Sequence, residues 1–144
     1  YNCPGQIVIS GTEQGVAEAI QALKQAGAKR ALPLTVHGAF HSGLMQMAQD
    51  KLAPFLEKAP ITESDSQLVM NVPGDFVSSQ EEMRKYLIEQ VTSSVRWEQG
   101  VRMIEAKGVD LYLEIGCGKP LSGLNKKIGV AVPTVPLEKI SDLE

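Results

Sequence analysis

Cysteine and histidine are scarce in this sequence, and their scarcity excludes two common kinds of protein. The 144 residues include two cysteines and two histidines. Cys3 and Cys117 are too isolated to build a disulfide framework or a zinc site, and His37 and His41 fall within one short segment. The sequence therefore predicts neither a disulfide-stabilised fold nor a metal centre.

Long apolar runs, a signal peptide and an excess of positive charge are also missing. No stretch approaches the roughly 20 apolar residues that a transmembrane helix requires. The formal net charge of -3 gives no reason to expect nucleic-acid binding. Because 43% of the residues are hydrophobic, enough for one packed core, we expect a soluble cytoplasmic protein that binds neither membrane nor nucleic acid.

A serine nucleophile in its usual setting is absent as well. Enzymes of the α/β-hydrolase type place this serine in a Gly-x-Ser-x-Gly turn, where the strained bend needs small flanking residues. The pattern occurs nowhere in the sequence, since Ser10, Ser42 and Ser122 all lack the flanking glycines. The sequence therefore contains no serine in the setting of a nucleophile elbow.

The most informative segment that is present surrounds His41. Upstream, residues 32–36 alternate between apolar and other side chains, which predicts a strand. Downstream, Ser42 is a candidate N-cap for a helix whose apolar residues recur at helical spacing as far as Leu56. His41 thus lies at a strand-to-helix connection, where α/β enzymes often place a general base. From this local pattern alone, a capped surface or core histidine is the favoured interpretation.

Helical and strand-like segments alternate along the rest of the chain. Helices are predicted at 16–23 before Gly27, at 80–90 behind a Ser79-x-x-Glu82 capping box, at 97–108 and at 121–128. Strands are predicted at residues 7–9, 29–36, 68–72, 109–115 and 130–135. This order favours an α/β fold in which parallel strands are joined by helical crossovers.

Five motifs resemble one family in their order and spacing. They are Asn2-x-Pro-x-Gln6, Ala28-Lys-Arg-Ala-Leu-Pro-Leu34, Gly38-Ala-Phe-His41-Ser42, the stretch from Gln90 to Trp97, and Glu114-Ile-Gly-Cys-Gly-Lys119. The chain is similar to malonyl-CoA:acyl carrier protein transacylases and to the acyltransferase domains of polyketide and fatty acid synthases. The resemblance implies the C-terminal half of an α/β-hydrolase-like acyltransferase. Residues 1–37 would be the second half of a ferredoxin-like subdomain, a β-α-β unit, and residues 38–144 part of the large domain.

The resemblance also implies roles for particular residues. His41 matches the catalytic histidine, and Gln90 matches the glutamine whose backbone carbonyl orients that histidine. Phe40 matches an aromatic position associated with malonyl selection, and Asn2, with Gln6, would order the floor of the cleft. The family's carboxylate-binding arginine and serine elbow match nothing in this sequence, so the resemblance implies that this chain alone does not turn over an acyl substrate. Four basic residues match positions that would dock an acidic carrier protein, namely Lys29, Arg30, Lys126 and Lys127.

The glycine-rich turn before Lys119 departs from the family. Gly116-Cys-Gly118 stands where the family has Gly-Pro-Gly, so Cys117 is either a reactive thiol at a helix N-terminus or an inert loop thiol. The spacing of this turn fits neither a Walker nor a Rossmann phosphate loop.

The expected substrates are malonyl-CoA and phosphopantetheinylated acyl carrier protein, with no bound cofactor. The expected partners are the carrier protein and a missing N-terminal half that carries the nucleophilic serine. Two alternatives remain open: a fragment of a polyketide synthase acyltransferase domain, and a non-catalytic fragment that binds a carrier protein.

Overall fold

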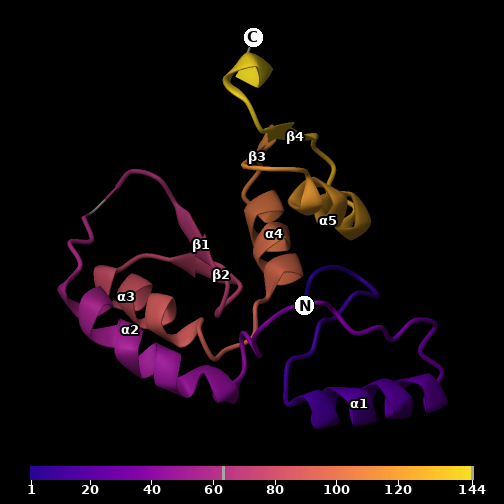
Figure 1. Cartoon of the computed structure of the whole chain (residues 1–144). Helices are drawn as coiled ribbons and strands as arrows, with labels where there is room; N and C mark the ends of the chain where they lie inside the picture. The colour runs from indigo at the N-terminus through magenta and orange to yellow at the C-terminus, as the bar shows by residue number, and fades with distance from the viewer. Residues whose placement is uncertain (63, 144) are drawn as a thin grey trace.

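The helices and strands form a mixed arrangement in which α4 lies between two groups of elements (Figure 1). The computed structural model describes residues 1–62 and 64–143. One group contains helices α2 (Gln46–Lys58) and α3 (Gln80–Glu89) with strands β1 (Leu68–Met70) and β2 (Asp75–Val77). The other contains β3 (Tyr112–Ile115), β4 (Thr134–Leu137) and α5 (Pro120–Ile128), beside α4 (Trp97–Ala106).

The remaining elements lie near the two ends of the chain and before α2. Helix α1 (Glu13–Gln25) stands apart from both groups in Figure 1 and has no buried residue. Two short 3-10 helices, η1 (Gly43–Met45) and η2 (Ile140–Leu143), precede α2 and follow β4. None of the helices among the described residues combines the length and apolar character needed to cross a membrane.

Local signals in the sequence fix the helix ends as predicted. Ser79 and Glu82 form a reciprocal capping box at the start of α3. Hydrogen bonds from the backbone amides of Ser78 and Ser79 hold the pKa of Glu82 below its usual value. At the end of α1, Gly27 adopts a φ of 89°, and the Ala28 amide donates to the Leu23 carbonyl at 2.9 Å. This is a Schellman closure, which glycine favours because it adopts positive φ without steric cost.

Two pairs of strands supply the sheet structure. β3 and β4 are parallel, with Tyr112 opposite Thr134, and α5 is the crossover between them, so the predicted parallel connection is confirmed. β1 and β2 form an antiparallel hairpin, with Leu68 opposite Val77. The sequence predicted β1 but missed β2. The α/β class itself is confirmed.

The strands predicted at residues 7–9 and 29–36 are wrong. Both segments run as irregular backbone on either side of α1, so the described residues contain no β-α-β unit there. Their apolar side chains remain largely in solvent, with Ile7 63% and Leu32 60% exposed. A strand requires a hydrogen-bonded neighbour, and an alternating pattern cannot provide one. The predicted buried face is therefore not formed, and within the described residues no element covers these apolar side chains.

A small core joins the N-terminal segment to α4 and α5. Cys3, Val101 and Ile128 are buried together, and four partly buried side chains pack against them: Trp97, Tyr112, Leu124 and Val130. Cys3 is therefore a packing residue with a free thiol. This core fixes the N-terminal segment around Cys3 against α4 and α5.

Candidate active site

His41 lies at the junction between an irregular segment and η1, and its backbone is strained. Its φ is +60°, the only positive value among the described non-glycine residues. Such a conformation is costly for a residue with a β-carbon and persists only when surrounding contacts enforce it. Ser42 begins η1, accepting from the Leu44 amide at 3.3 Å and donating to the Ala39 carbonyl at 2.6 Å. The turn therefore presents the imidazole on an exposed surface.

The end of α3 supplies the contacts that hold His41. The backbone oxygen of Gln90 lies 2.7 Å from Nδ1 of His41, and the amide of His41 donates to the Val91 carbonyl at 3.2 Å. The last carbonyls of a helix have no partner within the helix and carry partial negative charge. His41 satisfies two consecutive carbonyls, one with its ring and one with its backbone.

The partner atom determines which nitrogen of His41 carries the proton. A carbonyl oxygen can only accept, so Nδ1 must donate to Gln90. In the neutral ring, Nε2 then bears the lone pair and can remove a proton from a nucleophile. A neutral carbonyl stabilises the imidazolium less than a carboxylate would, which suits a base that returns its proton readily.

Two side-chain hydrogen bonds hold the segment at Gln90 and Thr92, and no pattern in the sequence predicts them. The side chain of Asn71, at the end of β1, donates to Oε1 of Gln90 at 3.4 Å. The hydroxyl of Thr92 donates to Oε1 of Gln49 in α2 at 2.6 Å. Only the tertiary structure brings these residues together, since they are separated by 19 and 43 positions. Alternating or helical spacing cannot reveal such pairs.

Phe40 precedes His41 and its ring folds back over Gly38. A β-carbon built on Gly38 would lie 3.0 Å from Cε2 and Cζ of the ring, closer than a relaxed contact. The Phe40 side chain is 52% exposed. Glycine at position 38 therefore leaves room for the aromatic ring next to the histidine turn.

Asn2 and Gln6 form a tight turn that is tied to the end of α5. The amides of Asn2 and Gln6 donate to Gln6 O and Cys3 O at 3.1 and 2.9 Å. Oε1 of Gln6 accepts from Nζ of Lys127 at 3.0 Å. Lys127 is thus partly engaged within the chain, and the side chain of Gln6 serves a structural contact.

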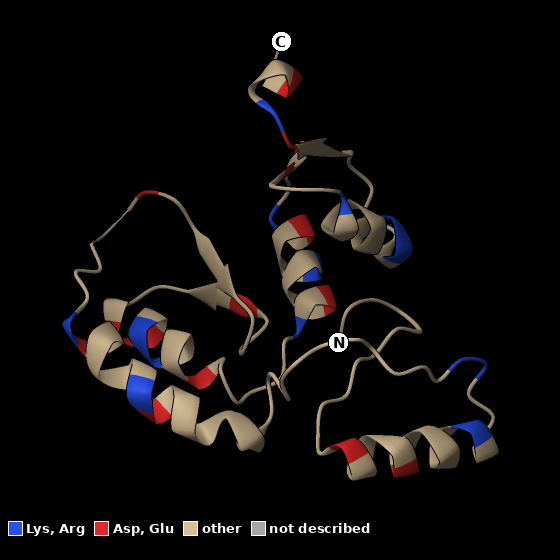
Figure 2. Cartoon of the chain, viewed as in Figure 1, with Lys and Arg blue, Asp and Glu red and all other residues tan. Residues whose placement is uncertain are grey.

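The four basic residues lie on two separate surface segments. Lys29 and Arg30 follow α1, whereas Lys126 and Lys127 occupy the last turn of α5, and all four are exposed. Figure 2 shows both blue segments on the right of the view, outside the group formed by α2 and α3. Basic residues in a last helical turn also interact favourably with the helix dipole.

Glu114, at the end of β3, is buried and caps α5. Its carboxylate accepts from the amides of Leu121 and Ser122 at 2.7 Å each and from the Ser122 hydroxyl at 2.5 Å. Desolvation alone would raise the pKa of Glu114, but these hydrogen bonds outweigh it and leave the pKa below its usual value. Glu114 thereby fixes the turn at Gly116-Cys-Gly118, where the Cys117 thiol is free and exposed.

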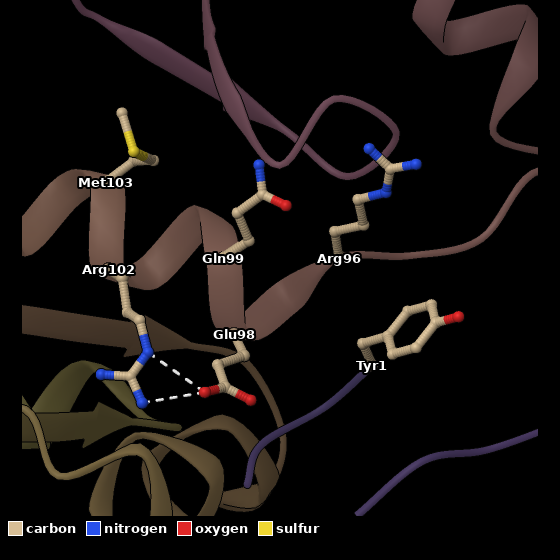
Figure 3. Close-up of a pocket in the computed structure, with 6 residues that line it drawn as sticks. All are labelled: Tyr1, Arg96, Glu98, Gln99, Arg102 and Met103. Carbon is tan, nitrogen blue, oxygen red and sulfur yellow. Dashed lines mark hydrogen bonds and ion pairs between the residues drawn. The ribbon is translucent and has the colours of Figure 1, made fainter.

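A shallow pocket of about 590 Å³ lies beside the start of α4, and His41 does not line it. It is lined by Tyr1, Arg96, Glu98, Gln99, Arg102 and Met103 (Figure 3). Arg102 points at Glu98 and pairs with it through Nη2 at 2.8 Å, so its charge is neutralised within the wall. Within residues 1–62 and 64–143, no three His, Cys, Asp or Glu side chains come together as metal ligands would. We therefore assign the candidate site to His41 rather than to this pocket.

Comparisons with known proteins agree on one family. The family described as "Acyl transferase domain" matches residues 1–119. The malonyl CoA-acyl carrier protein transacylase of Bacillus subtilis (strain 168) is 43% identical over 143 residues, which are 99% of this chain and 45% of that protein. The crystal structure of MCAT from Streptococcus pneumoniae has a TM-score of 0.93 and 36% identity, covering 99% of this chain and 47% of that chain.

A third relative was solved with a partner. It is a malonyl-transacylase in complex with its type II PKS acyl-carrier protein, with a TM-score of 0.86 and 38% identity, covering 92% of this chain and 43% of that chain. In each comparison the chain spans about half the length of the relative it matches.

Proposed function

Since this chain belongs to the acyl transferase domain family, we propose that it supplies the general base for transfer of malonyl from CoA to the phosphopantetheine thiol of an acyl carrier protein. The observation that carries this proposal is the 2.7 Å contact between His41 Nδ1 and the Gln90 carbonyl. It leaves Nε2 of an exposed imidazole ready to accept a proton. The nucleophilic serine would come from a segment outside these 144 residues.

The proposed reaction passes through an acylated serine. Nε2 of His41 takes the proton of the serine hydroxyl while the oxygen attacks the malonyl thioester, and the imidazolium returns the proton to the departing CoA sulfur. The pantetheine thiol of the carrier protein then gives its proton to Nε2 and attacks the acyl-serine, and the serine oxygen recovers a proton. The first half-reaction converts a thioester into an ester, and the second converts the ester back into a thioester. A base that passes easily between neutral imidazole and imidazolium is therefore suited to both.

A hybrid enzyme tests the proposal directly. We define the hybrid as the Bacillus subtilis relative in which this chain replaces the matching segment of 143 residues. The hybrid should transfer malonyl to carrier protein, and its His41→Ala variant should lose several orders of magnitude in kcat. The 144-residue chain alone should show no transfer. Unchanged activity in the His41→Ala hybrid would refute the general-base role.

The hybrid also separates the alternatives. A non-catalytic carrier-binding segment would give a hybrid that binds carrier protein and has no transferase activity. A polyketide-type activity would appear as faster transfer to a type II polyketide carrier than to a fatty acid carrier. The fatty acid assignment expects the reverse order.

A further inference from the structure

We propose that Thr92 and Gln49 are positioning residues for His41, acting through the hydrogen bond between their side chains. The inference rests on the proposed function, because it assigns a means of holding the general base. The Thr92 hydroxyl lies 2.6 Å from Oε1 of Gln49. Among the described residues neither side chain is hydrogen-bonded to the imidazole, so we expect their effect on the ring to be transmitted through the backbone between positions 90 and 92.

The segment after α3 is attached to the His41 side of the molecule at three successive residues. The Gln90 carbonyl accepts from the ring of His41, and the Val91 carbonyl accepts from its backbone amide. The third attachment is Thr92 to Gln49, which lies in the first turn of α2. The first two bonds involve His41 itself. Of these three, the third does not involve the histidine, and it acts together with the Asn71 side chain, which donates to Oε1 of Gln90 at 3.4 Å.

Helices α2 and α3 are held at both ends by polar contacts. They pack side by side (Figure 1), and the guanidinium of Arg84 in α3 donates to the backbone oxygens of Leu56 and Ala59 at the end of α2. Apolar packing between helices is not directional, so it does not define how far one helix slides along the other. Arg84 sets this register at one end, and Thr92 with Gln49 sets it at the end that carries the Gln90 carbonyl.

The position of that carbonyl matters because His41 is strained. A φ of +60° persists only while its contacts outweigh the local cost. If the segment shifts, the ring loses its partner at Nδ1 and can change to the tautomer that protonates Nε2. That tautomer has no lone pair on the nitrogen that must accept the serine proton. The bond between Thr92 and Gln49 therefore protects the active tautomer.

Nitrogen-15 NMR of the His41 imidazole in the 144-residue chain tests the inference without any measurement of turnover. Spectra at about pH 8.5, where histidine is neutral, report the ratio of the two ring tautomers. Thr92→Val removes the hydroxyl and keeps the shape, and Gln49→Met removes the acceptor from the other side. Each should lower the ratio of Nδ1–H to Nε2–H about fivefold, the effect of losing one hydrogen bond. The double variant should fall no further than either single variant, since both remove the same bond.

Two variants serve as controls. Thr92→Ser keeps the hydroxyl and should retain the wild-type ratio. Thr35→Val makes the same substitution at an exposed threonine upstream of His41 and should change nothing. Wild-type ratios in Thr92→Val and Gln49→Met, or effects that add in the double variant, would overturn the inference. So would unfolding of both single variants by circular dichroism, because the bond would then maintain the fold rather than position the ring.

The experiment also distinguishes this inference from the proposed function. If the wild-type ring does not hold its proton on Nδ1, the general-base role fails together with the positioning role. If the wild-type ring does hold it and the variants hold it equally, only the positioning role fails.

Discussion

The backbone amide of His41 donates to the carbonyl of Val91 at 3.2 Å while His41 adopts a φ of +60°. The strained residue is thus held by the same segment that orients its ring. Strain at a functional residue is tolerated when fixed neighbours compensate for it. The backbone conformation of His41 thus sets the direction of its side chain at a cost in local stability.

Replacing His41 by glycine and by alanine should reveal this strain. Both variants lack the imidazole, so they differ mainly in the cost of a β-carbon at positive φ. We expect His41→Gly to be more stable than His41→Ala by about 1 kcal/mol in urea unfolding. At Ala48, inside α2, the order should reverse, and Ala48→Gly should lose about 1 kcal/mol. An alanine variant that equals or exceeds the glycine variant at position 41 would contradict the strain.

The sequence predicted the elements that depend on local signals. The capping box at Ser79, the glycine closure at Gly27 and the apolar spacing of α5 each lie within a few residues of the feature they specify. The helices were therefore predicted nearly in full. The strands at 7–9 and 29–36 were wrong because a strand needs a neighbour that its own residues do not encode.

The candidate site was predictable only in part, for the same reason. His41 and Gln90 could be named together because the resemblance to a family supplied their relationship, and the structure brings them into contact. Gln49, Thr92 and Glu114 act through partners that the chain meets only after folding. No periodicity marks a threonine that bonds a glutamine 43 positions away.

Glu114 makes the stability of the chain depend on pH. Its folded-state pKa is lowered, so it adds stability above its unfolded pKa of ~4.3, and this contribution is lost as pH falls through the folded pKa. Glu114→Gln should therefore unfold at lower urea concentration than wild type at about pH 7, with a difference that shrinks below about pH 4. Glu57→Gln, an exposed carboxylate on α2, is the control and should change little. A difference that stays constant with pH would rule out the ionised carboxylate as the cap.

Phe40 should influence which acyl group the hybrid enzyme accepts. A bulky ring next to the reacting carbonyl leaves little space for an α-methyl group, and one methyl contact changes selectivity by about 10-fold or more. Phe40→Ser should raise methylmalonyl transfer relative to malonyl transfer by about 10-fold in competition assays. Phe55 is also exposed but lies on α2, so Phe55→Ser should leave the ratio unchanged. If both variants behave alike, Phe40 does not face the substrate.

The last turn of α5 should contribute to docking of an acidic carrier protein. Lys126 and Lys127 are both exposed, but Lys127 also donates to Gln6, so Lys126 is the cleaner test of a purely electrostatic role. In the hybrid enzyme, Lys126→Glu should raise the KM for carrier protein several-fold and leave the KM for malonyl-CoA nearly unchanged. Exposed charges act mainly on encounter, so the wild-type advantage should shrink as salt rises and the Debye length falls from about 10 Å at 0.1 M to about 3 Å at 1 M.

Two comparisons separate docking from a change in helix stability. Lys126→Gln removes the charge without repelling an acidic partner, so it should give a smaller rise in KM than Lys126→Glu. Lys51→Glu makes the same reversal on α2 and should leave the carrier KM near wild type. Reversal also weakens the favourable interaction of a basic residue with the end of α5, by about 0.3–1 kcal/mol. That loss would lower stability and affect both substrates equally. If the KM for carrier protein changes neither with the charge at position 126 nor with the salt concentration, these lysines are ordinary solvated surface residues.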